Sequence, residues 1–379
     1  MRIFLLSIYA QIFLNAYILW RGYQALPPKR IVRIPFILFF VFELLLYSFG
    51  YIFYKDLPDG ILYPIMMICN TWFIASIYIG LGIIGLDLVR LSNHIHPWYP
   101  EIVKKKWTSI KVILFFVFVF SVIGLMIKAY HNAMYPEVRH VNIQCSKKVE
   151  GKDHLTIGLI SDLHIGGSVG KKSVQRFVAL CNAEHLDMVV IAGDIIDYES
   201  LSAEKNHIEE DLQQLQAPLG VYITLGNHEY RANRYAKLRW LNQTGGILLV
   251  DSVAMPDSTF YLIGRDDVIN RNRASMESLM VGLDLTKPVI VIDHQPKYVE
   301  DIIKNQCDLG LFGHTHNGQY WPAPLFLKFI LKYPYGYFKK DDTHIYVSSG
   351  IGFAGPPYRI GTRSELVVLH VTFANEQSF

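Results

Sequence analysis

The hydrophobic positions of this chain follow two different patterns, and the change falls near residue 130. Before that point four long apolar runs follow one another, at residues 3–20, 34–54, 61–86 and 112–127. Each run has about the length, ~20 residues, that a helix needs to cross ~30 Å of hydrocarbon. A helix of a soluble bundle would keep a polar face, and residues 112–120 have none. The pattern therefore predicts a transmembrane domain of four helices within residues 1–130.

The loops between these runs differ in charge, and the difference predicts an orientation. The first and third loops are basic, with Arg21, Lys29, Arg30 and Arg33 in the first and Arg90, Lys104, Lys105, Lys106 and Lys111 in the third. The second loop, residues 55–60, has one lysine and two aspartates. Basic loops favour the cytoplasmic side of a membrane. We therefore expect a multi-pass membrane protein in which the chain beyond the fourth run lies on the extracytoplasmic face.

One ionisable residue, Glu43, falls near the middle of the second run. A carboxyl group at that depth is costly and usually faces other protein groups or water. Two interpretations stay open. Glu43 has a function inside the membrane, or it is hydrogen-bonded by Asn15 or Asn70 within a bundle of helices.

After a polar stretch at residues 131–153, which we interpret as a linker, short apolar runs alternate with amphipathic stretches. The apolar runs predict strands at residues 155–160, 188–192, 221–225, 260–263, 289–292 and 309–312. The stretches between them predict helices at residues 172–184, 203–215, 235–242 and 298–304. This alternation predicts an α/β domain over residues 154–379, which is long enough to bury a core of its own.

Composition and charge exclude some classes of protein. Of the 379 residues, 51% are hydrophobic, which fits an integral membrane protein better than a soluble one. The net charge is only +3, and no basic run is interleaved with aromatic residues in the polar half. We therefore exclude nucleic acid as a partner. The four cysteines form no C-x-x-C pair, so neither a disulfide framework nor a cysteine-bound structural zinc is predicted.

The candidate chemistry lies where the predicted strands end. Five strands are each followed at once by carboxylate, imidazole or amide side chains: Asp162 and His164, Asp194 and Asp197, Asn227 and His228, His294, and His314 and His316. Strand ends that meet at one edge of a sheet are where α/β proteins place their sites. We expect these side chains to converge.

This mixture of side chains points to metal-dependent chemistry. Carboxylates together with imidazoles and an amide suit divalent or trivalent first-row ions. There are more ligands than one ion can use, whereas two ions ~3.5–4 Å apart, bridged by a carboxylate and a water, would use them all. Such a pair lowers the pKa of the bridging water and supplies a hydroxide for attack on phosphorus. The residues therefore predict hydrolysis of a phosphoester.

In order along the chain, the motifs D-x-H at residue 162, G-D-x-x-D at 193, G-N-H-E at 226, the single histidine at 294 and G-H-x-H at 313 resemble the calcineurin-like metallophosphoesterases. The resemblance covers residues 155–379. It implies a two-sheet sandwich flanked by helices, with the metals at the strand ends. Within the motifs, Asn317 stands where a second glycine is usual, and Glu229 replaces the commoner aspartate.

The resemblance also implies a role for each site residue. One ion would be held by Asp162, His164 and His316, the other by Asn227, His294 and His314, and Asp194 would bridge them. His228 would contact the phosphate and protonate the leaving oxygen, and Asp197 would orient His228. Manganese is the metal expected first, ahead of iron, zinc or magnesium.

The tail at residues 346–359 resembles the membrane-associated branch of the same family, so we expect a membrane-anchored phosphohydrolase whose substrate is a lipid-linked phosphoester or pyrophosphate. Two alternatives stay open: hydrolysis of soluble phosphoesters with the spans only as an anchor, and a non-catalytic membrane sensor or scaffold. Residues 320–335, dense in aromatic and apolar side chains, follow the last histidines directly. They either form a lid that enters the membrane interface or pack as a loop that completes the core.

Overall fold

The computed structural model describes residues 2–53 and 57–374, and it divides into two compact units, residues 1–129 and 130–379. Residues 54–56, which belong partly to the predicted acidic loop 55–60, lie outside the described residues. Each unit has its own internal packing.

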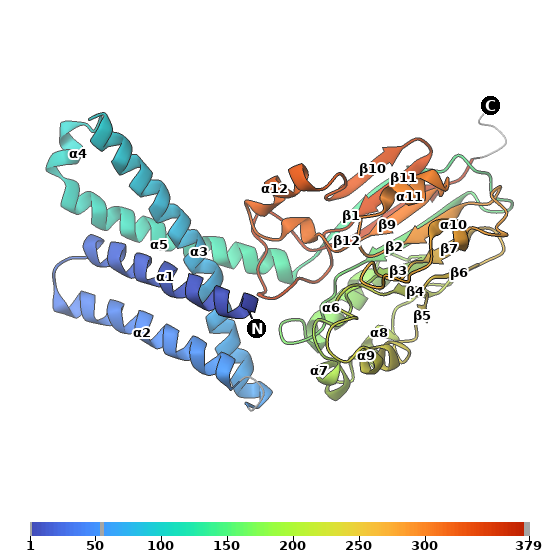
Figure 1. Cartoon of the computed structure of the whole chain (residues 1–379), viewed down its shortest axis with the longest axis horizontal. Helices are drawn as coiled ribbons and strands as arrows, with labels where there is room; N and C mark the ends of the chain where they lie inside the picture. The colour runs from blue at the N-terminus through green and yellow to red at the C-terminus, as the bar shows by residue number, and fades with distance from the viewer. Residues whose placement is uncertain (1, 54–56, 375–379) are drawn as a thin grey trace. The chain divides into compact units, whose positions relative to one another are not determined.

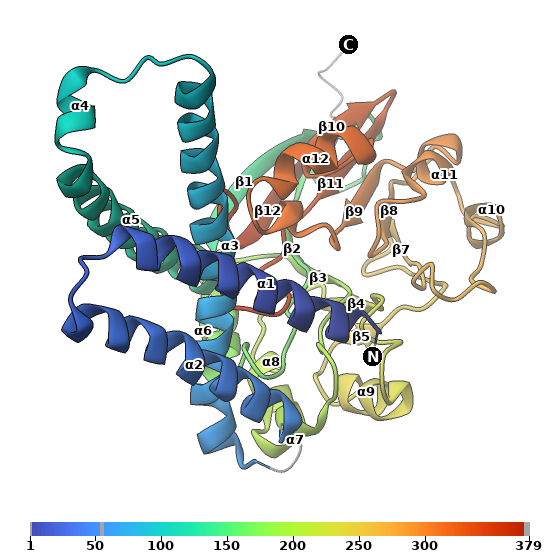
Figure 2. The ribbon, with the colours of Figure 1, turned by 60° about the vertical axis from the view of Figure 1, so that its left-hand side comes forward.

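The first unit consists of helices, and α1 and α2 each lie against α3 (Figure 2). The helices are α1 (Arg2–Ala25), α2 (Arg30–Ile52), α3 (Asp59–Ile95), α4 (Glu101–Lys105) and α5 (Trp107–Met134). Among the described residues, three segments are long and apolar enough to cross a membrane, namely Arg30–Gly50, Gly60–Ile95 and Trp107–Met134. The first predicted span, residues 3–20, lies within α1, and its crossing of the membrane stays a prediction.

Polar side chains inside this unit pair with one another across the helices. Glu43 on α2 is buried and accepts a hydrogen bond from Asn15 Nδ2 on α1 at 3.4 Å. The amide oxygen of Asn15 in turn accepts from the indole of Trp72 on α3 at 2.9 Å. The structure therefore supports the second interpretation of Glu43, a hydrogen bond within the bundle of helices, and the donor is Asn15.

The second unit is built on two mixed sheets of six strands each (Figure 1). The first sheet has the order β1 (Glu137–Gln144), β12 (Glu365–Thr372), β2 (His154–Ile160), β3 (Met188–Ala192), β4 (Val221–Thr224) and β5 (Ile247–Leu248). The second has the order β10 (Gly336–Lys340), β11 (Thr343–Val347), β9 (Leu309–Phe312), β8 (Val289–Ile292), β7 (Tyr261–Gly264) and β6 (Ser252–Ala254). Neighbouring strands β2 to β5 run parallel, as do β7, β8, β9 and β11.

Alternating side chains give each central strand two buried faces. In β3, Val190 packs in the core between the sheets, whereas Val189 and Ile191 pack in the core on the outer face. Helices cover both outer faces. The first sheet carries α6 (Lys171–Asn182), α7 (Leu201–Lys205), α8 (Ile208–Leu212) and α9 (Arg234–Leu241), and the second carries α10 (Met276–Leu279) and α11 (Val299–Lys304). The predicted two-sheet sandwich flanked by helices is confirmed for this unit.

Two local predictions differ from the observed elements. Residues 203–215, predicted as one helix, form the short helices α7 and α8, because His207 between them adopts a left-handed backbone with φ 50°. Residues 131–153, predicted as a linker, include the end of α5 and the strand β1, which pairs in parallel with β12. That pairing is long-range, and the polar sequence of β1 gives no sign of it.

Candidate metal centre

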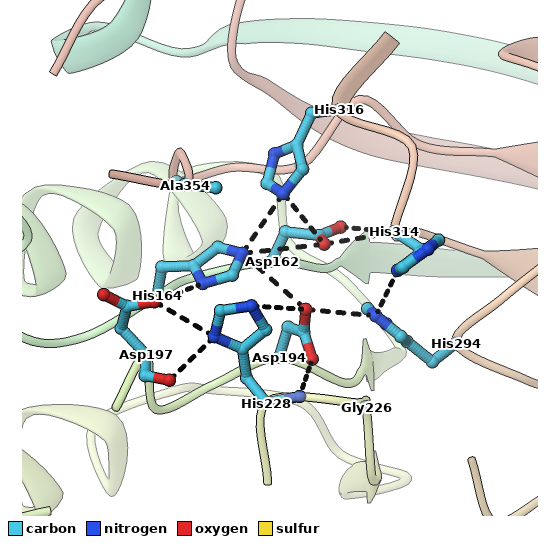
Figure 3. A network of polar contacts seen from close by, with 12 residues as sticks. Asp162, His164, Asp194, Asp197, Gly226, His228, His294, His314, His316 and Ala354 are labelled. Carbon is cyan, nitrogen blue, oxygen red and sulfur yellow. Dashed lines mark hydrogen bonds and ion pairs between the residues drawn. The ribbon is translucent and has the colours of Figure 1, made fainter. Parts of the chain in front are cut away.

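The strand ends bring all nine predicted site residues together, and Figure 3 labels each of them except Asn227, whose Oδ1 lies 3.2 Å from His294 Nε2. Strands β2, β3 and β4 of the first sheet deliver Asp162, His164, Asp194, Asp197, Asn227 and His228, and strands β8 and β9 of the second deliver His294, His314 and His316. Because the two sheets share one core, their carboxyl-terminal edges face a common space.

The first group contains Asp162, His164 and His316, whose ligand atoms lie within 4.8 Å of one another. The Nε2 atoms of the two histidines are 3.1 Å apart, and His316 Nε2 is 3.4 Å from Asp162 Oδ1. The other ring nitrogen of His164 is 3.3 Å from the carboxylate of Asp197. Its proton is therefore held there, and His164 Nε2 is left with a lone pair directed into the group.

The second group contains Asp194, His294 and His314, with Asn227 beside them. His294 donates from Nδ1 to the carbonyl of Ala192 at 2.8 Å, so its Nε2 faces the group. That nitrogen is 3.2 Å from Asp194 Oδ2 and equally far from Asn227 Oδ1, and both of these oxygens are acceptors. Acceptors that converge in this way fit a cation among them.

Asp194 belongs to both groups. Its Oδ2 lies 3.2 Å from His294 Nε2 in the second group and 3.7 Å from His164 Nε2 in the first. Its Oδ1 accepts the backbone N–H of His228 at 2.7 Å, which fixes the carboxylate between the groups. A shared carboxylate at this position is the geometry expected of a bridging ligand.

The side chain of His228 is held at one nitrogen only. Its Nδ1 lies 2.7 Å from the carbonyl of Asp197 and 3.0 Å from the Asp197 carboxylate, so both acceptors favour a proton there. Its Nε2 faces the site, 4.0 Å from Asp194 Oδ2. Asp197 therefore orients two imidazoles at once, those of His164 and His228.

Backbone strain concentrates at these positions. Asp162, His164, Asp194, His314 and His316 all have left-handed backbones, with φ between 50° and 72°. Non-glycine residues rarely adopt this conformation, and it persists where the surrounding structure imposes it, often at functional sites. Asn317, the departure from the family motif, also lies there, at φ 48°, and its residue type tolerates that region.

The charges in the site leave the carboxylates ready to bind a cation. Burial would raise the pKa of Asp194, but the nearby imidazoles, His294 above all, hold that pKa well below its usual value. Burial lowers the pKa of His316 to about 3, so this imidazole is neutral at physiological pH. Burial also opposes the charge on His294, but Asp194 raises its pKa well above the usual value. A cation bound there would displace that proton.

Two buried side chains that the sequence analysis did not assign to the site hold its loops in place. Glu229 is fully buried and accepts the backbone N–H groups of Asp194, Ile195, Ile196 and Gly226 at 2.8–3.0 Å. It thereby ties the loop after β3 to the loop after β4. Arg359, also fully buried, donates to the carbonyls of His316, Ser349 and Gly352. In the sequence, Glu229 is only a conservative replacement within its motif, and Arg359 is only part of the tail.

At the strand ends of a two-sheet sandwich, two groups of candidate imidazole and carboxylate ligands share Asp194. This fold and this site are those of a metal-dependent phosphoesterase. A sequence profile described as calcineurin-like phosphoesterase matches residues 155–318. Residues 155–318 therefore form a domain of the calcineurin-like phosphoesterase type, a family of dinuclear metal-dependent enzymes that hydrolyse phosphoester bonds.

Two relatives by sequence carry the metallophosphoesterase name. An uncharacterized metallophosphoesterase of Helicobacter pylori is 27% identical over 358 residues, which is 92% of each chain. A zebrafish (Danio rerio) transmembrane protein with metallophosphoesterase domain is 31% identical over 264 residues, 65% of this chain and 59% of that one. A solved dimetal phosphatase, also from Danio rerio, has 15% identity and a TM-score of 0.39 over 59% of this chain and 100% of that one. The chain spans about 60% of the length of the longer animal relatives.

Proposed function

We propose that this protein is a membrane-anchored, dinuclear metal-dependent phosphohydrolase. The observation that carries the proposal is the position of Asp194, whose carboxylate lies between two groups of imidazole and carboxylate ligands. In the proposed arrangement Asp162, His164 and His316 hold one ion, Asn227, His294 and His314 hold the other, and Asp194 bridges them. The ions, when bound, would supply an activated water and neutralise phosphoryl oxygens.

The chain's own residues would handle the proton of the leaving group. His228 keeps its Nδ1–H on Asp197 and directs Nε2 into the site, where a phosphoester oxygen would lie. A protonated Nε2 can contact the phosphoryl group and then donate its proton to the leaving oxygen. Asp197, which is fixed by both His164 and His228, would keep the ring in this orientation.

The finer parts of the proposal concern substrate, metal and topology. Three described helices long and apolar enough to cross a membrane support a substrate that resides there, which we propose to be a lipid-linked phosphoester or pyrophosphate. The mixed imidazole and carboxylate ligands support manganese, with iron, zinc or magnesium as substitutes. The basic loops support four spans and a catalytic domain on the extracytoplasmic face.

Hydrolysis can be tested with the full chain in detergent, stripped of metal and reloaded with Mn²⁺. We would measure release from p-nitrophenyl phosphate, from bis-p-nitrophenyl phosphate and from a lipid extract, with Asp194→Asn as the inactive variant. We expect metal-dependent turnover in the wild type and none in the variant. A protein that binds two ions per chain and hydrolyses none of these substrates would instead be a sensor.

The proposed orientation has its own test. A reporter enzyme that is active only in the cytoplasm, fused to the C-terminus, is expected to be inactive in cells, whereas one that is active only outside the cytoplasm is expected to work. The opposite pattern would place the catalytic domain in the cytoplasm and overturn this part of the proposal.

A further inference from the structure

Helix α12 (Ala323–Ile330), labelled in Figure 1, carries several large apolar side chains that are exposed. None of its eight residues, all of which the structure describes, is buried. The exposed fractions of Phe329 and Ile330 are 88% and 74%, and those of Phe326 and Leu325 are 58% and 49%. Four large apolar side chains in one short helix face outward, which is unusual for a surface that only meets water.

This helix does not complete the core. Within the described chain, the buried clusters on both faces of the two sheets include no residue of α12. Tyr333, three residues beyond the helix, does join the cluster on the outer face of the second sheet. Of the two interpretations of residues 320–335, the packed loop therefore holds for the end of the segment and not for α12.

The exposed helix is held firmly next to the candidate metal centre. It follows the short 3₁₀ turn His316–Gly318 almost directly, and a Cβ added to Gly318 would come within 2.8 Å of Pro324 N. Before the helix, Trp321 donates its backbone N–H to the carbonyl of Ile360 at 2.7 Å. After the helix, Thr315 Oγ1 donates to the carbonyl of Pro334 at 2.7 Å. A surface bound by α12 would therefore lie beside His316.

Basic side chains lie near the apolar ones. Lys328 is on the helix itself and is exposed, and Lys332 follows two residues after its end. Lys332 and Lys340 both contact the carboxylate of Glu300, at 2.5 and 2.8 Å. Large apolar side chains with lysines beside them are the composition of helices that lie in the interface of a membrane.

We propose that α12 inserts its apolar side chains into the interfacial layer of a lipid bilayer, so that the metal centre meets phosphoesters of membrane lipids. The bilayer is the chosen occupant because the same chain carries helices long and apolar enough to span one. The part that concerns lipid hydrolysis rests on the proposed function, whereas insertion of α12 does not.

Insertion can be measured with an environment-sensitive fluorophore on Phe329→Cys, with the full chain in phosphatidylcholine and phosphatidylglycerol vesicles. The four native cysteines are buried, so the label is directed to the new thiol. Val281→Cys is the matched control, because Val281 is 79% exposed and follows α10 on the catalytic unit. We expect blue-shifted emission at position 329, quenched by lipids with spin-labelled acyl chains, and neither effect at position 281.

Two results would overturn the proposal. Emission at position 329 as water-like as at position 281 would show that α12 stays in solvent. Blue-shifted emission that spin-labelled lipids do not quench would show that protein, from this chain or a second copy, covers the helix.

The consequence for catalysis is tested with Phe326→Ser/Phe329→Ser against Val281→Ser. We expect hydrolysis of lipid phosphoesters in vesicles to fall by roughly ten-fold or more in the double variant, since interfacial binding scales with buried apolar area. Hydrolysis of bis-p-nitrophenyl phosphate is expected to stay unchanged in both variants. Equal loss on both substrates would contradict a role at the membrane. If the wild type hydrolyses nothing, the proposed function fails while the fluorescence result still decides insertion.

Discussion

His228 Nε2 lies 4.0 Å from Asp194 Oδ2, and the two side chains have different roles in the proposed reaction. Asp194 lies between the two ligand groups, whereas His228 is held at Nδ1 by the carbonyl and the carboxylate of Asp197 and directs Nε2 at the same space. Removing a bridging ligand and removing a proton donor should therefore be separable by experiment. Substitutions at Asp194 should therefore change metal binding, and substitutions at His228 should change the rate of the chemical step.

Substitution of His228 by asparagine should leave metal content unchanged and reduce kcat. Loss of a general acid typically costs ~10²–10⁴-fold. The loss should be largest for esters with poor leaving groups and smaller for p-nitrophenyl esters, whose leaving oxygen needs less help. Metal analysis and kcat for both kinds of ester check this, with His185→Asn as a control on an exposed histidine outside the site. A variant that loses metal would show that His228 is a ligand.

Substitution of Glu229 by glutamine should destabilise the catalytic unit. The carboxylate accepts four backbone N–H groups, and an amide would turn its NH₂ towards two of them. Leaving buried donors unpaired costs about 1–3 kcal/mol each. Thermal unfolding of this variant should begin at a lower temperature than that of the wild type or of Glu210→Gln, an exposed glutamate. Equal midpoints in all three proteins would refute the role assigned to Glu229.

The sequence predicts that nine side chains converge, and the structure brings those nine together, because each follows a strongly apolar run and falls in a recognisable motif. It does not reveal the holding roles of Glu229 and Arg359. Their partners are backbone groups from loops that meet only in the fold, so neither the spacing nor the residue type marks them. Long-range contacts of this kind have no local signal.

At the scale of elements, the strands that deliver the site residues are predictable, whereas the edge strands β1 and β10 and the buried strands β11 and β12 are not. Strands β3, β8 and β9 are uninterrupted apolar runs, because both of their faces are covered. Strands β1 and β10, with the sequences EVRHVNIQ and GYFKK, lie at sheet edges, and their pairing depends on β12 and β11. The polar sequence of β1 is the reason that a linker is predicted at residues 131–153.

The turn after β4 gives a prediction at this scale. A Cβ added to Gly226 would come within 2.2 Å of Asp194 Oδ1 and 2.4 Å of the backbone nitrogen of Asp194. Gly226→Ala should therefore displace the proposed bridging carboxylate, and we expect fewer than two ions per chain by metal analysis. Gly170→Ala is the matched control, since nothing lies within 4 Å of its added Cβ. Full metal content in Gly226→Ala would contradict the bridging position of Asp194.

At the scale of the whole molecule, the chain joins a unit of long apolar helices to a unit whose candidate metal centre holds several buried ionisable groups. The boundary near residue 130 is visible in the sequence, because hydropathy changes abruptly there. Substrate identity is not visible in the same way, since motifs encode the chemistry at phosphorus and say nothing of the group attached to it. The exposed apolar side chains of α12, which only the fold reveals, therefore bear on the class of substrate.

Metal removal should destabilise the catalytic unit. Asp162 and Asp194 are buried, and a carboxylate oxygen of each lies within 3.9 Å of His164 Nε2. Cations bound among these ligands would stabilise the folded form by mass action. We expect a chelator to lower the thermal unfolding midpoint and added Mn²⁺ to restore it. The Asp194→Asn variant should show a smaller shift. A thermal unfolding midpoint that changes with neither the chelator nor the added metal would show that no ion binds at this site.

The most direct test of a dinuclear centre is a titration of metal-free protein with Mn²⁺, with bound ions per chain and hydrolysis of bis-p-nitrophenyl phosphate measured on the same samples. We expect activity to follow the occupancy of the second ion, to reach its maximum at two ions per chain and to be absent from Asp194→Asn. Full activity at one ion per chain, or none at two, would contradict the proposed dinuclear centre.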